Sequence, residues 1–147
     1  MKKQLILGNL LPLLLGSLIY ISFRSDTLLI FKFFSALSID TPIEYLRENT
    51  MGLKQYLPDW FLFSLPDGLW VFSYVSLMLL IWNNTISKYN IFWIILIPII
   101  AVLSEFGQSI KITPGTFDPL DLIFYILGTF FSLLIFTNTN QLNIKKI

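Results

Sequence analysis

The sequence contains no cysteine and no histidine among its 147 residues. The absence of cysteine excludes disulfides, zinc–thiolate sites and cysteine nucleophiles. The absence of histidine removes the commonest metal ligand and the commonest acid–base group. Any catalysis by this chain must therefore depend on carboxylates, amides, hydroxyls, lysine or arginine.

Charge is also scarce, because only 13% of the residues are charged whereas 55% are hydrophobic. A soluble domain has about a quarter of its residues charged, so this composition indicates a lipid environment. The formal net charge is +1, and no Lys/Arg-rich run alternates with the aromatic residues. We therefore expect the lipid bilayer as a partner and do not expect nucleic acid.

Four long apolar segments predict membrane-spanning helices, at about residues 5–23, 66–82, 91–110 and 119–137. Each has the length that a spanning helix needs, roughly 17–25 residues. The first segment could also be the core of a signal peptide, but no small-x-small cleavage site precedes Arg24, which favours a retained helix. The expected fold is an all-α integral membrane protein, a single domain over residues 1–147 with a four-transmembrane-helix bundle.

The segment between the first two spans, residues 24–65, predicts short interfacial helices in an outer-side loop. Thr27–Ile39 is apolar but too short to span, and it suits a helix at the membrane interface or packed on the bundle. Thr41-Pro42-Ile43-Glu44 has the pattern of a capping box, which predicts a helix from Pro42 to about Asn49. Leu65–Gly68 has the composition of a turn.

Two spans carry stripes of small and polar residues at helical spacing, which are expected to face other helices. In the first span the stripe contains Asn9, Gly16 and Tyr20. In the fourth span the spacings of four, three and four place on one face Asp121, Tyr125, Gly128 and Ser132. Small residues allow close backbone approach, so Gly128 and Ser132 are expected to serve helix packing.

The distribution of lysine predicts the orientation in the membrane. With four spans, both termini and the polar turn at 83–90 lie on one side, and these segments hold Lys2, Lys3, Lys88, Lys145 and Lys146. The positive-inside rule therefore places both termini in the cytoplasm. In this arrangement all nine acidic residues fall on the outer side.

Glu105 is the strongest candidate for a chemical role, because it lies within the third apolar segment. A carboxylate there needs a partner or a task, since desolvation is costly and the dipole near a helix C-terminus disfavours negative charge. Gln108 lies one turn further and can share its face. The short loop between the third and fourth spans predicts that Glu105, Gln108 and Asp121 converge. The alternative role of Glu105 is a hydrogen bond that fixes helix packing.

The other acidic candidates have simpler structural interpretations. Asp118 precedes Pro119 and fits a helix N-cap, and Asp121 would then occupy the third helical position. Asp67 also fits a helix start. Glu105 is the candidate acid–base group, and the candidate substrate-binding residues are Gln108, Asp121, Asp67, Tyr125 and Asp118. Three of the carboxylates could bind a divalent cation through oxygen ligands, although no metal or cofactor is firmly implied.

Three stretches of the sequence carry a resemblance to a known family. They are Leu65–Tyr74 (LPDGLWVFSY), Glu105–Gln108 (EFGQ) and Gly115–Gly128 (GTFDPLDLIFYILG). Together with the four spans they resemble the VanZ-like family, and the matching positions are Asp67, Glu105, Gln108, Asp121 and Gly128. The resemblance implies a bacterial cell-envelope protein of the cytoplasmic membrane, and the family's founding member is linked to resistance to teicoplanin-type glycopeptides.

Three positions depart from the family pattern. Val71 stands where the family often has His, Thr116 where it often has Arg, and Tyr125 where Asn is common. The chain therefore resembles a diverged branch, in which any chemistry that needs that His or Arg lacks its residue.

The functional hypothesis is an outward-facing acidic and amide pocket that binds or modifies a polar headgroup, such as a lipid-linked cell-wall precursor or a glycan. In an enzymatic version Glu105 is the acid–base group, and Asp121 and Asp67 hold the substrate or a cation. The alternative is a non-catalytic accessory subunit that packs on a larger envelope enzyme or exporter. A transporter is disfavoured, because no inverted repeat or pair of broken helices occurs.

Overall fold

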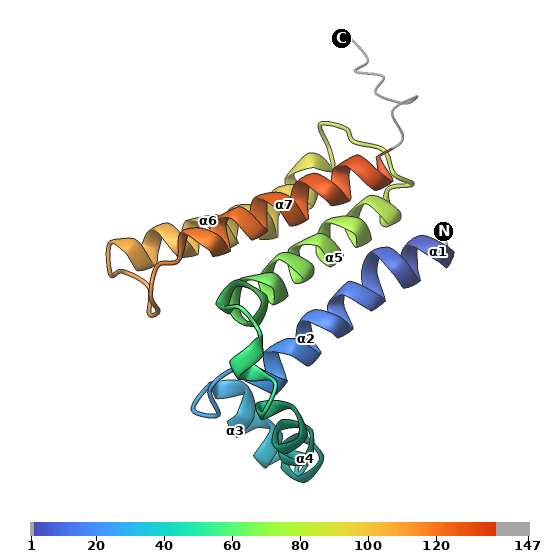
Figure 1. Ribbon diagram of the computed structural model, residues 1–147. Coiled ribbons are helices and arrows are strands. Elements are labelled where there is room, and N and C mark those ends of the chain that lie inside the picture. Colours follow the sequence, from blue (N-terminus) through green and yellow to red (C-terminus); the bar gives the residue numbers. More distant parts are fainter. Residues whose placement is uncertain (1, 138–147) are drawn as a thin grey trace.

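The computed structural model describes residues 2–137, which form helices and no strands (Figure 1). Four helices are long and apolar enough to cross a membrane, and they run over Lys2–Phe23, Trp60–Ile81, Ile91–Ser109 and Pro119–Phe136. The prediction of an all-helical chain with four candidate spans is confirmed. The second of these helices begins at Trp60, six residues before the predicted start.

The first long helix consists of α1 (Lys2–Gln4), the π-helical segment η1 (Leu5–Leu10) and α2 (Leu11–Phe23). Its polar stripe faces the second long helix, as predicted. Asn9 Nδ2 donates to Ser73 Oγ at 2.9 Å, and Ser73 Oγ donates to the Asn9 carbonyl at 3.0 Å. Nearer the other end, the ring of Tyr20 lies 5.0 Å from that of Trp70. These buried contacts fix the register of the two helices.

The second long helix joins the π-helical segment η3 (Trp60–Ser64) to α5 (Leu65–Ile81) without a break. The turn predicted at Leu65–Gly68 is therefore wrong. The Leu65 N–H donates to the Trp60 carbonyl, the last bond of the π-helical pattern, and Pro66, which has no N–H, lies directly after it where the α-helical pattern begins. The helix consequently continues outward past Pro66 and includes Ser64 and Asp67.

The fourth long helix, α7 (Pro119–Phe136), packs most extensively on α5. Gly128 lies so close to the Gly68 carbonyl that a side chain at 128 would overlap the carbonyl oxygen. A side chain at Gly68 would in turn lie 3.0 Å from Phe124 Cβ. Ser132 is fully buried. The packing role predicted for Gly128 and Ser132 is confirmed.

Helix α6 (Ile91–Ser109) is the antiparallel neighbour of α7, as the short connection between them predicted. It contributes the buried residues Ile94, Pro98 and Glu105. The Tyr74 hydroxyl of α5 donates to the Trp93 carbonyl, which ties the start of α6 to the centre of the bundle. Helix α5 therefore has α2, α6 and α7 packed around it.

The segment after α2 forms α3 (Leu29–Ala36), α4 (Asp40–Met51) and the 3₁₀ turn η2 (Lys54–Tyr56). Helix α4 begins at Asp40 with Ile39 as its N-cap, so the predicted capping box at Thr41 does not start the helix. The α3–α4 pair continues past the end of α2, on the side away from α6 and α7 (Figure 1). No residue of α3 is buried.

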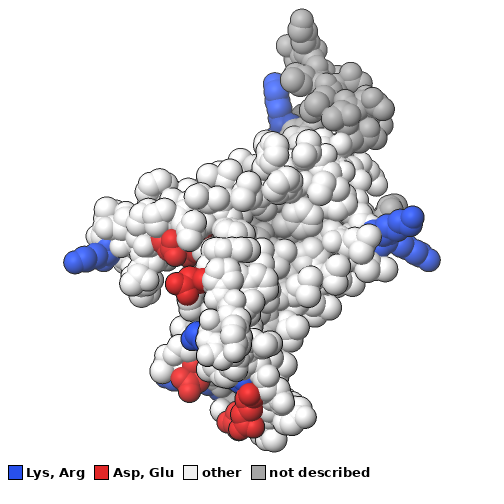
Figure 2. Space-filling view, viewed as in Figure 1, with Lys and Arg blue, Asp and Glu red and all other residues white. Residues whose placement is uncertain are grey.

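The antiparallel arrangement collects the acidic residues at one end of the bundle. All nine lie in α3–α4 and their flanking loops, near the starts of η3, α5 and α7, or near the end of α6. Figure 2 shows the acidic atoms on this side of the molecule and basic atoms at several edges. Lys2, Lys3 and Lys88 lie at the opposite end, whereas Lys145 and Lys146 fall outside the described residues. We call the acidic end the outer end below, following the predicted orientation.

Replacing Gly128 with Ala tests the close contact between α5 and α7. The added methyl group would overlap the Gly68 carbonyl and force α7 outward, and overpacking of this kind costs roughly 1–3 kcal/mol. We expect a lower midpoint of thermal unfolding in detergent, followed by circular dichroism. Gly52→Ala is the control, because Gly52 has a helical φ of −61° and no atom near the added methyl. Equal midpoints for the two variants would contradict the contact.

Candidate functional site

Polar side chains from every long helix meet at the outer end of the bundle. This polar cluster consists of Arg24, Ser64, Asp67, Glu105, Gln108, Asp118, Asp121 and Tyr125. All six residues singled out from the sequence belong to it, and Arg24 and Ser64 join them. Asp67 is close enough to Arg24, Asp121 and Glu105 for their charges to interact. The predicted convergence of the polar residues is therefore present.

Glu105 is 3% exposed, and both of its carboxylate oxygens have hydrogen-bond partners. Gln108 Nε2 donates to Oε1 at 3.1 Å, and the backbone N–H of Asp118 donates to Oε2 at 3.3 Å. The second bond joins the end of α6 to the start of α7. The packing role that the sequence left as an alternative thus has a direct structural basis.

The α6–α7 loop folds back over Glu105 and Gln108. Thr113 Oγ1 donates to the Ser104 carbonyl at 3.0 Å. Gly115 has a φ of +128°, and a Cβ there would lie 2.7 Å from Gln108 Oε1. The backbone conformation therefore favours glycine at position 115, and any larger residue would also displace the Gln108 side chain.

Asp118 is the N-cap of α7, as predicted from its position before Pro119. Its Oδ1 accepts a hydrogen bond from the backbone N–H of Leu120 at 2.9 Å. Its own backbone N–H donates to Glu105. Both the side chain and the backbone N–H of Asp118 therefore form local hydrogen bonds, which argues against the substrate-binding role expected for its side chain.

Asp121 and Ser64 each contain a buried atom without a hydrogen-bond partner in the described residues. Asp121 lies in the first turn of α7, and its Oδ1 is buried without a hydrogen bond. The Ser64 side chain is 0% exposed and lies beside the Asp121 carboxyl, but its Oγ has no partner of hydrogen-bonding geometry within the described residues. Buried polar atoms are rarely left unpaired, because each costs desolvation energy. The Ser64 hydroxyl and the Asp121 carboxyl lie side by side, and one hydroxyl uses only part of the accepting capacity of a carboxylate.

Arg24 supplies the cation of the cluster. It follows the last residue of α2, and its Nη2 lies 3.8 Å from Asp67 Oδ2 and donates to the Phe63 carbonyl at 3.2 Å. The guanidinium also lies over the Tyr20 and Phe63 rings. Its Nε is buried without a partner in the part of the chain described. Sequence reasoning missed Arg24, although a long cationic side chain just after an apolar span is a recognisable signal.

The carboxylates of the cluster are not arranged as a metal site. Between residues 2 and 137, no group of three or more Asp or Glu side chains is placed to hold one ion. The arrangement therefore gives no support to a divalent cation held by Asp67, Glu105 and Asp121 together.

Tyr125 lies one turn after Asp121 on α7, beside Asp67 and Glu105.

Comparison with known proteins returned no family model, no curated protein and no solved structure that matches the chain. The resemblance to the VanZ-like family thus rests on the residues quoted above. Of the positions that depart from that family, Val71 is buried in the core, Thr116 is exposed in the α6–α7 loop, and Tyr125 lies in the polar cluster.

Replacing Glu105 with Ala tests its structural role. The change leaves the Asp118 N–H without its acceptor in a part-buried position, and the loss of a fully buried partner costs about 1–3 kcal/mol, so the cost here should lie toward the lower end. We expect a lower thermal midpoint and faster hydrogen exchange at the Asp118 amide. Glu105→Gln keeps one carbonyl oxygen that can accept a hydrogen bond, so its thermal midpoint should fall less than that of Glu105→Ala. Exchange at Asp118 that is unchanged in Glu105→Ala would show that this bond does not hold the loop.

Proposed function

We propose that this chain is a VanZ-like multi-pass protein of the bacterial cytoplasmic membrane, with both termini in the cytoplasm. Its polar cluster opens outward and binds the polar headgroup of an envelope component, such as a lipid-linked cell-wall precursor or a glycan. Through this binding, the protein lowers the susceptibility of the cell to glycopeptide antibiotics.

The observation that supports this proposal is the group of unpaired buried atoms in the cluster. Ser64 Oγ, Asp121 Oδ1 and Arg24 Nε offer a hydroxyl, an acceptor and a donor without partners in the described chain. They lie at the outer end of helices that are long and apolar enough to span a membrane. Each of these atoms is buried, so a polar headgroup at the membrane surface completes these hydrogen bonds once the outer ends of the helices part around the cluster.

Binding accounts for the geometry better than catalysis by Glu105 does. Both Glu105 oxygens already accept hydrogen bonds, so an acid–base role requires one of these bonds to break first. Asp121 Oδ1 has no geometrically formed hydrogen bond to break, and the rearrangement it needs is exposure of a buried oxygen. In the binding role, Glu105 and Gln108 position the loop, and Asp121, Ser64 and Arg24 contact the headgroup.

The accessory-subunit alternative rests on a different feature, an apolar groove of about 510 Å³ between α6 and α7. Pro98, Val102 and Tyr125 are among the residues that line it. A spanning helix of a larger envelope protein would fill such a groove. Purification of the full chain in mild detergent with one stoichiometric membrane partner, lost in Val102→Trp, would favour this alternative.

The headgroup proposal predicts loss of function in Asp121→Asn and Ser64→Ala. Each change removes an unpaired group of the cluster and keeps the side-chain volume nearly constant. We expect either variant to abolish the envelope phenotype, measured as glycopeptide susceptibility in a strain without its native copy, at unchanged membrane abundance. Asp59→Asn is the control, because Asp59 is an exposed carboxylate at the same end. A phenotype that survives both cluster variants would refute the proposal.

The orientation predicts which loops react with an impermeant thiol reagent. The chain has no native cysteine, so a single introduced cysteine is a unique label. Cysteine at the exposed position Thr116 should react in intact cells, whereas cysteine at the exposed position Tyr89 should react only after permeabilisation. If Tyr89→Cys, and not Thr116→Cys, reacts in intact cells, the orientation is the opposite of the one predicted.

A further inference from the structure

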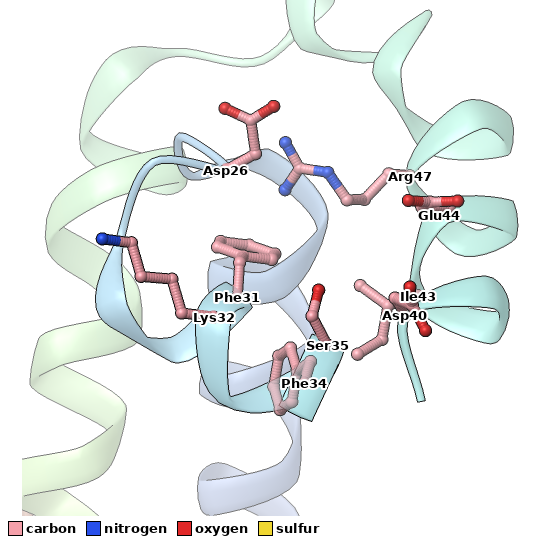
Figure 3. Close-up of a pocket in the computed structure, with 9 residues that line it drawn as sticks. All are labelled: Asp26, Phe31, Lys32, Phe34, Ser35, Asp40, Ile43, Glu44 and Arg47. Atoms are coloured by element: carbon pink, nitrogen blue, oxygen red, sulfur yellow. The ribbon is translucent and has the colours of Figure 1, made fainter. Parts of the chain in front are cut away.

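A hollow lies between α3 and α4, apart from the polar cluster (Figure 3). Its volume is about 250 Å³. It is lined by apolar side chains and by charges of both signs: Asp26, Phe31, Lys32, Phe34, Ser35, Asp40, Ile43, Glu44 and Arg47. A hollow of this mixed chemistry beside candidate membrane spans suits an amphipathic molecule.

Arg47 fixes the position of this hollow relative to α2. Its Nη1 donates to the carbonyls of Ile21 at 2.7 Å and Arg24 at 2.9 Å, which are at the C-terminal end of α2. The guanidinium also lies 4.7 Å from the centre of the Phe31 ring. A cation at this position is favoured by the helix dipole. Arg47 is therefore a positioning residue that holds α3 and α4 against α2.

Besides Arg47, the charged side chains of the hollow are Asp26, Lys32, Asp40 and Glu44. Figure 3 shows the Lys32 amino group on one side of Phe31, and Asp40 and Glu44 on the other side, on α4. None of these four forms an ion pair, because the one pair within 4.0 Å in residues 2–137 is Arg24 with Asp67. A ligand that carries a negative and a positive group can therefore meet both sides.

The solvent-exposed face of α3 is apolar. Leu29, Phe33 and Leu37 are 72%, 65% and 67% exposed. Helix α3 begins six positions after the last residue of α2, so it lies at the level where a spanning α2 leaves the hydrocarbon layer. An exposed apolar face at this level contacts lipid.

We propose that the α3–α4 hollow binds the headgroup of a zwitterionic phospholipid, with the lipid chains beside the apolar face of α3. Lys32 pairs with the phosphate, and Asp40 and Glu44 accept hydrogen bonds from the ammonium group. Purely anionic lipids lack the ammonium group and meet the carboxylates instead. This site and the polar cluster share no lining residue, although Arg47 of the hollow donates to the backbone carbonyl of Arg24.

Native mass spectrometry of the full chain tests the site. The protein is purified in detergent and given phosphatidylethanolamine or phosphatidylglycerol of identical acyl chains. We expect retention of one phosphatidylethanolamine at a concentration at which phosphatidylglycerol is not retained. The double variant Lys32→Ala/Glu44→Gln should weaken this binding by about tenfold or more, through loss of charge-assisted hydrogen bonds.

Glu48→Gln is the matched control, because Glu48 lies one turn after Glu44 on α4 and does not line the hollow. Its phosphatidylethanolamine binding should equal that of the unchanged chain. Lys32 and Glu44 are exposed, so the double variant should keep the thermal midpoint of the original protein. Equal retention of the two lipids, or binding unchanged in the double variant, would overturn the proposal.

Discussion

The contact between the backbones of Gly68 and Gly128 is the constraint on which the other features of the bundle depend. Helices that span a membrane gain little from burying apolar surface against one another, so for spans of this kind close van der Waals contact is the main source of helix association. This contact fixes α7 against α5 in one register. Asp67 precedes Gly68 directly, and this register brings it close to Asp121 in the first turn of α7. The polar cluster is thus a consequence of glycine packing.

The parts of the fold that the sequence predicted correctly depend on local physics. An apolar run of a given length predicts a span, and a short connection requires antiparallel neighbours, as found for α6 and α7. The polar stripe that contains Asn9 was also predictable, because residues at helical spacing lie on one face of the helix. The turn at Leu65–Gly68 failed because composition does not reveal that a proline in the first turn of a helix can follow a π-helical segment.

The candidate site was only partly predictable. Asp118 was recognisable because Asp-Pro is a local capping signal. The partner of Glu105 was not, because a backbone N–H has no residue-type signature and its position depends on how the α6–α7 loop folds. Arg24 reaches Asp67 because α2 packs on α5, and no local pattern encodes that distance. Ser64 stands out only once its burial and its missing partner are known.

Under the proposed function, the charges of the cluster restrict the kind of headgroup that it can receive. Arg24 already faces Asp67, and Glu105, Asp121 and Asp118 add further carboxylates around the unpaired atoms. A phosphate brought to this position would meet more negative than positive groups in a medium that screens charge poorly. Hydroxyl groups carry no such penalty, and they can donate to Asp121 and accept from Arg24 or Ser64. For a lipid-linked precursor, the sugar is therefore the part that matches the cluster, and its phosphates lie outside it.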